Sequence, residues 1–241
     1  MKIVLSPSKT KTISHTAEVI RDGQFQPLIT QKIIQHVQSL DVAALGKALK
    51  LKGDKAQSVF DFYEEFESHP VGFACESYDG IAFKYLDWAG LSDEAKAFGE
   101  THLAIMSALY GVVETTMGVR DYRLDMVDKV GLNLYEIWRE VVDAYFHKED
   151  WILNLASKEY AKMVNHPKVV TVEFWELRGD TYKQMSTSSK MSRGMMAHAC
   201  LTKQVKYVQD LPREINGFIC VTDIESITIP SESMTVRYER K

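Results

Sequence analysis

The chain has 241 residues, of which 45% are hydrophobic, so it is long enough to bury one continuous core. Its 29 Lys and Arg residues against 33 Asp and Glu residues give a net charge of −4 with neutral histidines, which excludes an overall basic field that attracts polyanions. Its longest apolar runs fall far short of the ~20 residues that a bilayer span requires, which argues against a membrane protein.

The N-terminal segment combines a short apolar strand with a cluster of hydroxyls and one cation. Met1 to Leu5 predict a buried strand, and Ser6 to Thr10 follow directly where it ends. There the hydroxyls of Ser6, Ser8 and Thr10, backbone N–H groups and the Lys9 ammonium are suited to one phosphate or carboxylate. The glycines of a P-loop are missing, which argues against a nucleotide cradle of that type. The alternative is a polar turn after a first strand.

The next third of the chain predicts several short helices. Apolar residues recur with helical spacing over 28–40, 42–49 and 56–66, and Asp41 is placed to cap the second of these helices. An amphipathic segment spans 81–88, Ser92 is placed to cap a further helix, and 103–109 predict a buried strand.

The second half alternates helix and strand. A helix is predicted over 132–147 and a strand over 151–155; strands at 169–175 and 181–187 flank a Gly179 turn as an antiparallel hairpin. A helix over 189–203 and strands near 217–223 and 234–239 complete the pattern. We therefore expect a mixed α/β, α+β-like fold in a single domain over residues 1–241, with a mixed sheet that contains an antiparallel hairpin and is flanked by helices.

A loop between residues 107 and 126 gathers residues that suit an anionic ligand. Tyr110 and Tyr122 offer stacking faces, Gly111 permits close backbone approach, and Arg123 has the geometry for a bidentate contact with phosphate or carboxylate. The alternative is a structural loop in which two arginines, Arg120 and Arg123, pair with two aspartates, Asp121 and Asp125.

Two further segments carry candidate anion-binding residues. Asn154 and Ser157 lie where a strand passes into a helix, and helix N-termini attract anions; the alternative is that Ser157 only caps the helix. Lys190 and Arg193 have an i, i+3 spacing among serines and threonines, so they share one helix face that suits a phosphate backbone. The alternative there is a solvated helix surface.

The cysteines and histidines give little evidence of metal or redox chemistry. Three cysteines without paired spacing, and no recognisable cleavable leader, predict free thiols and a cytoplasmic location. His198 and Cys200 form only one weak pair, and no zinc-binding spacing or nucleophile elbow is present. We therefore expect no metal site and no cofactor.

Six short segments, in the same order, resemble the bacterial YaaA family of peroxide stress response proteins. The family motifs are S-P-A-K-T, L-S-G-L-Y-G-V, P-Y-R-L-E-M, L-Y-x-F-W, N-L-A-S-x-E-Y and K-K-A-R-G. Their counterparts are Ser6 to Thr10, Met106 to Val112, Asp121 to Met126, Leu134 to Trp138, Asn154 to Tyr160 and Lys190 to Gly194. The resemblance extends from residue 3 to about 196.

The resemblance implies a cytoplasmic α/β protein of uncommon architecture that limits oxidative damage by lowering available iron and binds DNA through a basic cleft. It implies no established reaction. It also implies a helix-hairpin-helix element, which we place on residues 49–56, where backbone N–H groups would hold a phosphate without reading sequence. Its predicted contacts are Lys50, Lys52, Gly53 and Lys55. The alternative is an ordinary helix pair.

The chain departs from the family pattern at positions that lose charge or shape. Glu114 and Thr115 stand where the family has Arg-Pro, and Met191 replaces a lysine. These departures predict weaker binding to nucleic acid than in relatives.

Three hypotheses of function follow. The first is sequence-independent DNA binding, with Lys9, Arg123, Lys190 and Arg193 lining a cleft and the lysines of residues 49–56 as a second contact. The second is an enzyme or sensor for a phosphorylated or nucleotide-like small molecule, positioned by Ser6, Tyr110, Tyr122 and Asn154. The third is a protein-interaction scaffold.

Overall fold

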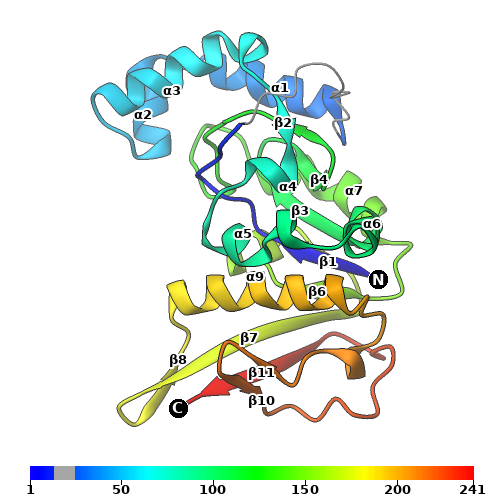
Figure 1. The fold of residues 1–241 in the computed structure, drawn as a ribbon. Helices are drawn as coiled ribbons and strands as arrows, with labels where there is room; N and C mark the ends of the chain where they lie inside the picture. Colours follow the sequence, from blue (N-terminus) through cyan, green and yellow to red (C-terminus); the bar gives the residue numbers. More distant parts are fainter. Residues whose placement is uncertain (14–24) are drawn as a thin grey trace.

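The computed structural model describes residues 1–13 and 25–241 of the chain, and its centre is a mixed sheet (Figure 1). In this part of the chain the strand order is β4-β3-β1-β6-β7-β11-β10-β9, with β8 paired to β7. The strands are β1 (Lys2–Leu5), β3 (Leu103–Ser107), β4 (Gly111–Glu114), β6 (Ile152–Asn154), β7 (Val169–Arg178), β8 (Thr181–Lys183), β9 (Glu214–Ile215), β10 (Phe218–Cys220) and β11 (Met234–Arg240). A separate pair joins β2 (Gly72–Phe73) to β5 (Gly118–Val119).

Parallel pairing dominates the middle of the sheet and antiparallel pairing its edges. Strands β3, β1, β6, β7 and β11 pair in parallel, whereas β4, β8, β10 and β9 are joined antiparallel. Every residue of β1 and β3 is buried, as expected for parallel strands covered on both faces. Along β7 the burial alternates, because one of its faces remains partly open to solvent.

The α-helices of the described chain are α1 (Pro27–Gln38), α2 (Val42–Leu49), α3 (Asp54–Glu64), α4 (Ala74–Ser77), α5 (Ile81–Leu86), α6 (Asp93–His102), α7 (Leu134–Phe146), α8 (Lys158–Ala161) and α9 (Ser186–Thr202). Short 3₁₀ turns lie at η1 (Phe66–Ser68), η2 (Trp88–Gly90) and η3 (Val208–Asp210). Helices α1, α2 and α3 form one end of the molecule, and β7, β10 and β11 form the other (Figure 1). None of these helices has the length and apolarity needed to cross a bilayer.

The predicted helix caps are confirmed. Asp41 accepts a hydrogen bond from the backbone N–H of Ala44 at 2.7 Å, and Ser92 accepts one from Ala95 at 3.3 Å. Each side chain satisfies a backbone N–H that has no partner within its helix, which fixes where α2 and α6 begin.

The predicted fold class is confirmed: the fold is mixed α/β, and the hairpin of β7 and β8 turns at Gly179, whose φ is +62°. The second hairpin strand is shorter than predicted, because α9 already begins at Ser186. The hydroxyl of Ser188 donates to Glu176 of β7 at 3.1 Å and so ties the first turn of α9 to the sheet. The short pairs made by β2, β5 and β9 have no counterpart among the predicted strands, since two residues carry no periodicity.

Helix α9 lies between α5 and the sheet, against β7 (Figure 1). At Gly194 the two helices are so close that an added Cβ would lie 2.1 Å from the carbonyl oxygen of Ala82. Only glycine permits this approach. The contact holds the middle of α9, which carries Lys190 and Arg193, near the segment that follows β1.

The order of the strands creates a topological switch between β1 and β6. The chain leaves β1 and returns to the sheet as β3 on one side, whereas it leaves β6 and returns as β7 on the other side. The two connections diverge, so a crevice forms at the carboxyl ends of these adjacent strands, where open α/β sheets bind ligands.

Candidate functional site

A pocket of about 490 Å³ lies at the switch between β1 and β6. Its lining comes from the segment after β1, the start of α5, the loop before α7, the segment after β6, and α9. The polar residues of the lining are Ser6, Ser8, Lys9, Thr10, Asp125, Ser157, Glu159, Tyr160, Lys190 and Arg193. Seven of the residues predicted to bind an anion therefore meet here: Ser6, Ser8, Lys9, Thr10, Ser157, Lys190 and Arg193.

The floor of the pocket joins the ends of the two diverging strands. The backbone N–H of Ser157 donates to Ser6 Oγ at 2.8 Å, and the Ser6 hydroxyl donates to Ser157 Oγ at 3.2 Å. The Ser157 side chain makes no capping bond to α8. Ser157 therefore ties β6 to β1 instead of capping the short helix that follows it.

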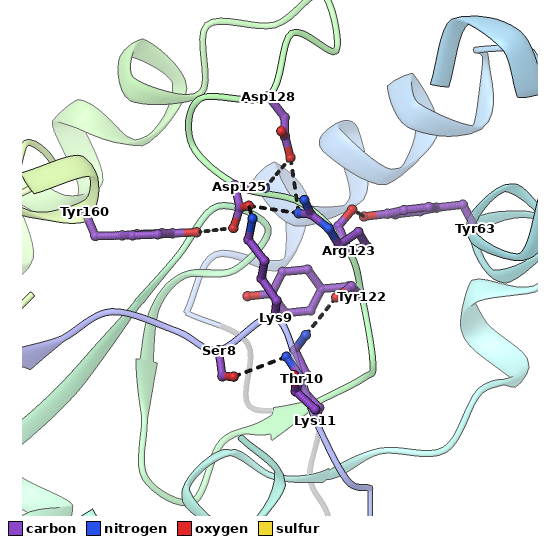
Figure 2. Close-up of polar contacts among 10 residues, drawn as sticks. All are labelled: Ser8, Lys9, Thr10, Lys11, Tyr63, Tyr122, Arg123, Asp125, Asp128 and Tyr160. Atoms are coloured by element: carbon purple, nitrogen blue, oxygen red, sulfur yellow. Dashed lines mark hydrogen bonds and ion pairs between the residues drawn. The ribbon is translucent and has the colours of Figure 1, made fainter. Parts of the chain in front are cut away.

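Asp125 is the centre of a polar cluster on one side of the pocket (Figure 2). Its carboxylate contacts Lys9 Nζ at 2.8 Å and Arg123 Nη1 at 2.9 Å, and it accepts a hydrogen bond from Tyr160 at 3.1 Å. Arg123 also contacts Asp128 at 3.4 Å. Two of the predicted cations are thus already paired with carboxylates.

The two carboxylates of this cluster have opposite pKa shifts. Burial raises the pKa of Asp125, but the hydrogen bond from Lys9 and the charge of Arg123 outweigh burial and leave its pKa below the ordinary value. For Asp128, burial dominates over the hydrogen bond from the Asp125 backbone and over Arg123, so its pKa is raised. Asp125 therefore keeps its charge to a lower pH than an ordinary aspartate, whereas Asp128 is protonated more readily.

Lys190 and Arg193 form the opposite, cationic wall. Lys190 is exposed and Arg193 is half-buried. Among residues 1–13 and 25–241 neither makes an ion pair or a side-chain hydrogen bond, and Arg193 Nε is buried with no partner there. Burial lowers the pKa of the Arg193 guanidinium, and the charge of Glu173 opposes this shift in part. An anion in the pocket would give both cations a partner.

Three polar residues of the lining were not predicted as site residues: Asp125, Glu159 and Tyr160. Burial, followed by the charge of Asp125, raises the pKa of Glu159, and its Oε1 is buried with no hydrogen-bond partner in the described chain. The sequence carries no local signal for these roles, because Asp125 and Glu159 meet only in the folded chain. Their place within the family motifs is the one indication that could have singled them out.

Four predicted site residues do not line the pocket: Arg123, which pairs with Asp125 and Asp128 beside it, and Tyr110, Tyr122 and Asn154, which lie in the core. Tyr110 and Tyr122 are each 2% exposed, with their rings in edge contact, so neither offers a stacking face to a ligand. The Tyr122 hydroxyl bonds Ser107 at 2.7 Å and Tyr78 at 3.1 Å. Buried Asn154 donates to Thr171 at 3.2 Å and accepts from the backbone of Ala156 at 3.0 Å, so it shapes the turn after β6.

The loop that was predicted either to bind a ligand or to be structural is held by ion pairs. Arg123 pairs with Asp125, as the structural alternative expected. Arg120 instead contacts Glu67 at 3.0 Å, and Asp121 lies 3.7 Å from buried Lys11. These contacts fix the loop that presents Asp125 to the pocket.

The residues for which the helix-hairpin-helix element was predicted span the end of α2, the short connection to α3 and the first turn of α3, at the end of the molecule formed by α1 to α3 (Figure 1). The side chains of Lys50, Lys52 and Lys55 are exposed, and Gly53 has a φ of +56°. Lys50 has a left-handed backbone, and the N–H of Leu51 donates to Gly46 at 2.8 Å. None of these residues lines the pocket, so they form a second basic surface.

The departures from the family pattern also lie away from the pocket. Glu114, at the end of β4, accepts a hydrogen bond from Tyr145 at 2.9 Å, and Thr115 is buried beside it. Met191 is half-buried on α9, and it does not line the pocket. The lost charges therefore leave the walls of the pocket unchanged.

In the described chain no three His, Cys, Asp or Glu residues gather closely enough to hold a metal ion. All three cysteines are free, and burial raises the pKa of Cys75 and raises that of Cys200 to about 12. Neither of these two thiols is a thiolate at neutral pH.

The model of the family described as "Peroxide stress protein YaaA" matches residues 1–219, which include the pocket and the hairpin. The chain belongs to the YaaA family. Related members are UPF0246 proteins of Desulfitobacterium hafniense, 31% identical over 90% of both chains, and of Finegoldia magna, 30% identical over 88% of this chain and 89% of the relative. A UPF0246 protein of Agathobacter rectalis is 29% identical over 94% of this chain and 96% of its own length. Membership of the YaaA family associates the chain with the response to peroxide stress.

Proposed function

We propose that this YaaA family member binds DNA without sequence preference, as part of the peroxide stress response. The supporting observation is the wall formed by Lys190 and Arg193, two cations that make no ion pair within the described chain. Lysine and arginine bind the phosphates of a DNA backbone through their charge. Such contacts carry no sequence information, so a wall of this kind suits DNA binding without sequence preference.

The charge distribution supports DNA binding at local basic sites and not through the total charge of the chain. The chain has a net charge of −4, so nonspecific attraction to a polyanion does not arise from its total charge. The exposed lysines at 50, 52 and 55 add a second cluster next to the N-terminus of α3. The pocket and the hairpin together would contact more than one phosphate.

The experiment is a fluorescence anisotropy titration of a short labelled duplex that carries 5′-phosphates, with the wild-type protein and with the double variant Lys190→Ala, Arg193→Ala. Each lost charge-assisted contact removes about 1.5–3 kcal/mol when it is fully formed, so we expect the affinity to fall by roughly tenfold or more.

The matched control is Lys203→Ala with Lys206→Ala. These exposed lysines lie at and beyond the other end of α9, so the control loses the same charge away from the pocket. We expect it to bind the duplex nearly as well as the wild type. Equal losses in both double variants would reject the pocket as the binding surface.

We also infer that the protein acts in the cytoplasm and limits iron-dependent damage. Family membership is the support for both inferences. Plasmid DNA exposed to ferrous iron and peroxide should be nicked less when the wild-type protein is added. Equal nicking with and without the protein would contradict direct protection.

A second candidate is an enzyme or sensor for a nucleotide-like small molecule. The shape of the site favours this candidate, because a pocket of about 490 Å³ lies within the range of small-ligand sites. A thermal-shift screen with nucleotides tests it: a saturable rise of the melting temperature with one nucleotide supports a small-molecule site, and no rise with any of them rejects it.

A further inference from the structure

The pocket is polarised, and its polarity restricts which ligand fits. One wall carries Lys190 and Arg193 from α9, and the other side carries Asp125 and Glu159. Asp125 is saturated by Lys9, Arg123 and Tyr160, whereas Glu159 Oε1 has no hydrogen-bond partner in the described chain. A ligand that satisfies both sides needs an anionic end for α9 and a hydrogen-bond donor for Glu159.

The cationic wall matches a dianion better than a monoanion. A phosphomonoester carries a charge of about −1.5 to −2 near neutral pH, whereas an internal phosphodiester carries about −1. Lys190 and Arg193 together supply two positive charges, and neither forms an ion pair with a carboxylate of the described chain. The hydroxyls of Ser8 and Thr10 in the same lining add donors for the remaining phosphate oxygens.

The size of the pocket limits how much of a nucleic acid enters. It extends over about 490 Å³ between α5, α9 and the switch of the sheet, whereas a duplex is roughly 20 Å across and cannot enter such a space. One nucleotide at the end of a strand fits the dimensions. Its terminal phosphate would lie against α9, and the hydroxyl or amino donors of its sugar or base would face Glu159.

From this geometry we infer that the pocket binds the phosphorylated terminal nucleotide of a DNA strand, a nucleoside 5′-monophosphate unit. This inference rests on the proposed DNA binding and assigns a distinct task to each basic surface. The hairpin between α2 and α3 contacts internal phosphates, and the pocket recognises the 5′-phosphate end. The same chemistry fits a free mononucleotide, which the experiment distinguishes.

The experiment measures binding to three DNAs of the same sequence: a duplex with 5′-phosphates, the same duplex with 5′-hydroxyls, and a closed dumbbell without ends. A parallel titration uses free deoxyadenosine monophosphate and deoxyadenosine. For the wild type we expect the 5′-phosphorylated duplex to bind about tenfold more tightly than the 5′-hydroxyl duplex, because the hydroxyl end lacks the charge-assisted contacts of a phosphate with Lys190 and Arg193.

The variants assign that preference to the pocket. The double variant Lys190→Ala, Arg193→Ala should bind the 5′-phosphorylated and the 5′-hydroxyl duplex with equal affinity. The control Lys203→Ala with Lys206→Ala should retain the wild-type preference for the 5′-phosphorylated duplex. Because Arg193 is half-buried, Arg193→Lys and the exposed Lys190→Ala keep the test valid should Arg193→Ala fold poorly.

The outcomes separate the two proposals. Equal binding of phosphate and hydroxyl ends, with no saturable binding of the mononucleotide, would overturn the inference while dumbbell binding still supports general DNA binding. Binding of the mononucleotide over the nucleoside, without any end preference on DNA, would support the phosphomonoester site and assign it to a free ligand. Failure to bind the dumbbell and the 5′-hydroxyl duplex would reject the proposed DNA binding itself.

Discussion

Asp125 connects the segment after β1 to the loop before α7. Its carboxylate is mostly buried and is held by Lys9, Arg123 and Tyr160 (Figure 2). Replacement of Asp125 by alanine leaves Tyr160 and Arg123 without this partner. We expect the free energy of unfolding to fall by about 1–3 kcal/mol. Urea denaturation at pH 7 measures this loss, and Asp180→Ala at the exposed β7–β8 turn serves as the control.

The same carboxylate makes stability sensitive to acid. The folded-state pKa of Asp125 lies below its ordinary value, so its stabilisation is present at neutral pH and is lost as the pH falls below about 4. In Asp125→Asn this part of the acid dependence should disappear. Parallel loss of stability in both proteins between pH 5 and 3 would contradict the assignment.

Lys11 should give a pH dependence of the opposite kind. Burial lowers its pKa to about 8, and its Nζ donates to the carbonyl of Tyr122 at 2.7 Å. Between pH 8 and 10.5 the unfolded chain binds more protons at this lysine than the folded protein, so this group makes stability rise with pH. Relative to Lys11→Met, the wild type should gain roughly 1–3 kcal/mol between pH 7 and 10. Denaturation curves at both pH values, with Lys183→Met as the control, test this sign, and an unchanged difference would contradict it.

At the residue level the sequence predicted which charged side chains meet better than it predicted which aromatic side chains are buried. Lys9, Lys190 and Arg193 were predicted from local clustering and do meet in one pocket. The tyrosines at 110 and 122 were wrongly expected to present stacking faces, because burial depends on neighbours such as Tyr78 that lie far away in the chain. Local composition carries no record of those neighbours.

Helix α9 positions the cationic wall, and its contact with α5 depends on Gly194. In an exposed helix a change from glycine to alanine stabilises by up to about 1 kcal/mol. At Gly194 the added Cβ would lie 2.1 Å from Ala82 O, so we expect destabilisation of about 1–3 kcal/mol or more instead. Thermal unfolding of Gly194→Ala against Thr187→Ala, an exposed site on the same helix, measures the effect. A stabilised Gly194→Ala would contradict the packing of α9 on α5.

At the level of elements, periodicity predicted the longer helices and the hairpin, and capping chemistry predicted where α2 and α6 begin. The i, i+3 spacing correctly placed Lys190 and Arg193 in one helix whose side chains line one pocket. What faces that helix could not be predicted. Its partners α5 and the end of β1 are separated from it by about a hundred residues or more, and only tertiary packing brings them together.

At the scale of the whole molecule, the order of the strands gathers the basic residues in spite of an acidic total charge. The β1 and β6 connections diverge, so the segments at residues 6–10 and 154–160 become neighbours at one crevice. The sequence predicted a mixed sheet but not the neighbours of each strand. The pairing of β1 with both β3 and β6 is a choice among several topologies that share the same local patterns.

The salt dependence of DNA affinity tests the central claim, that two separate basic surfaces contact phosphates. We predict that the slope of log affinity against log salt becomes shallower by about 0.9 for each phosphate contact removed, both in Lys190→Ala with Arg193→Ala and in Lys52→Ala with Lys55→Ala. The control Lys203→Ala with Lys206→Ala should retain the wild-type slope. Slopes that stay at the wild-type value in both test variants would contradict the account.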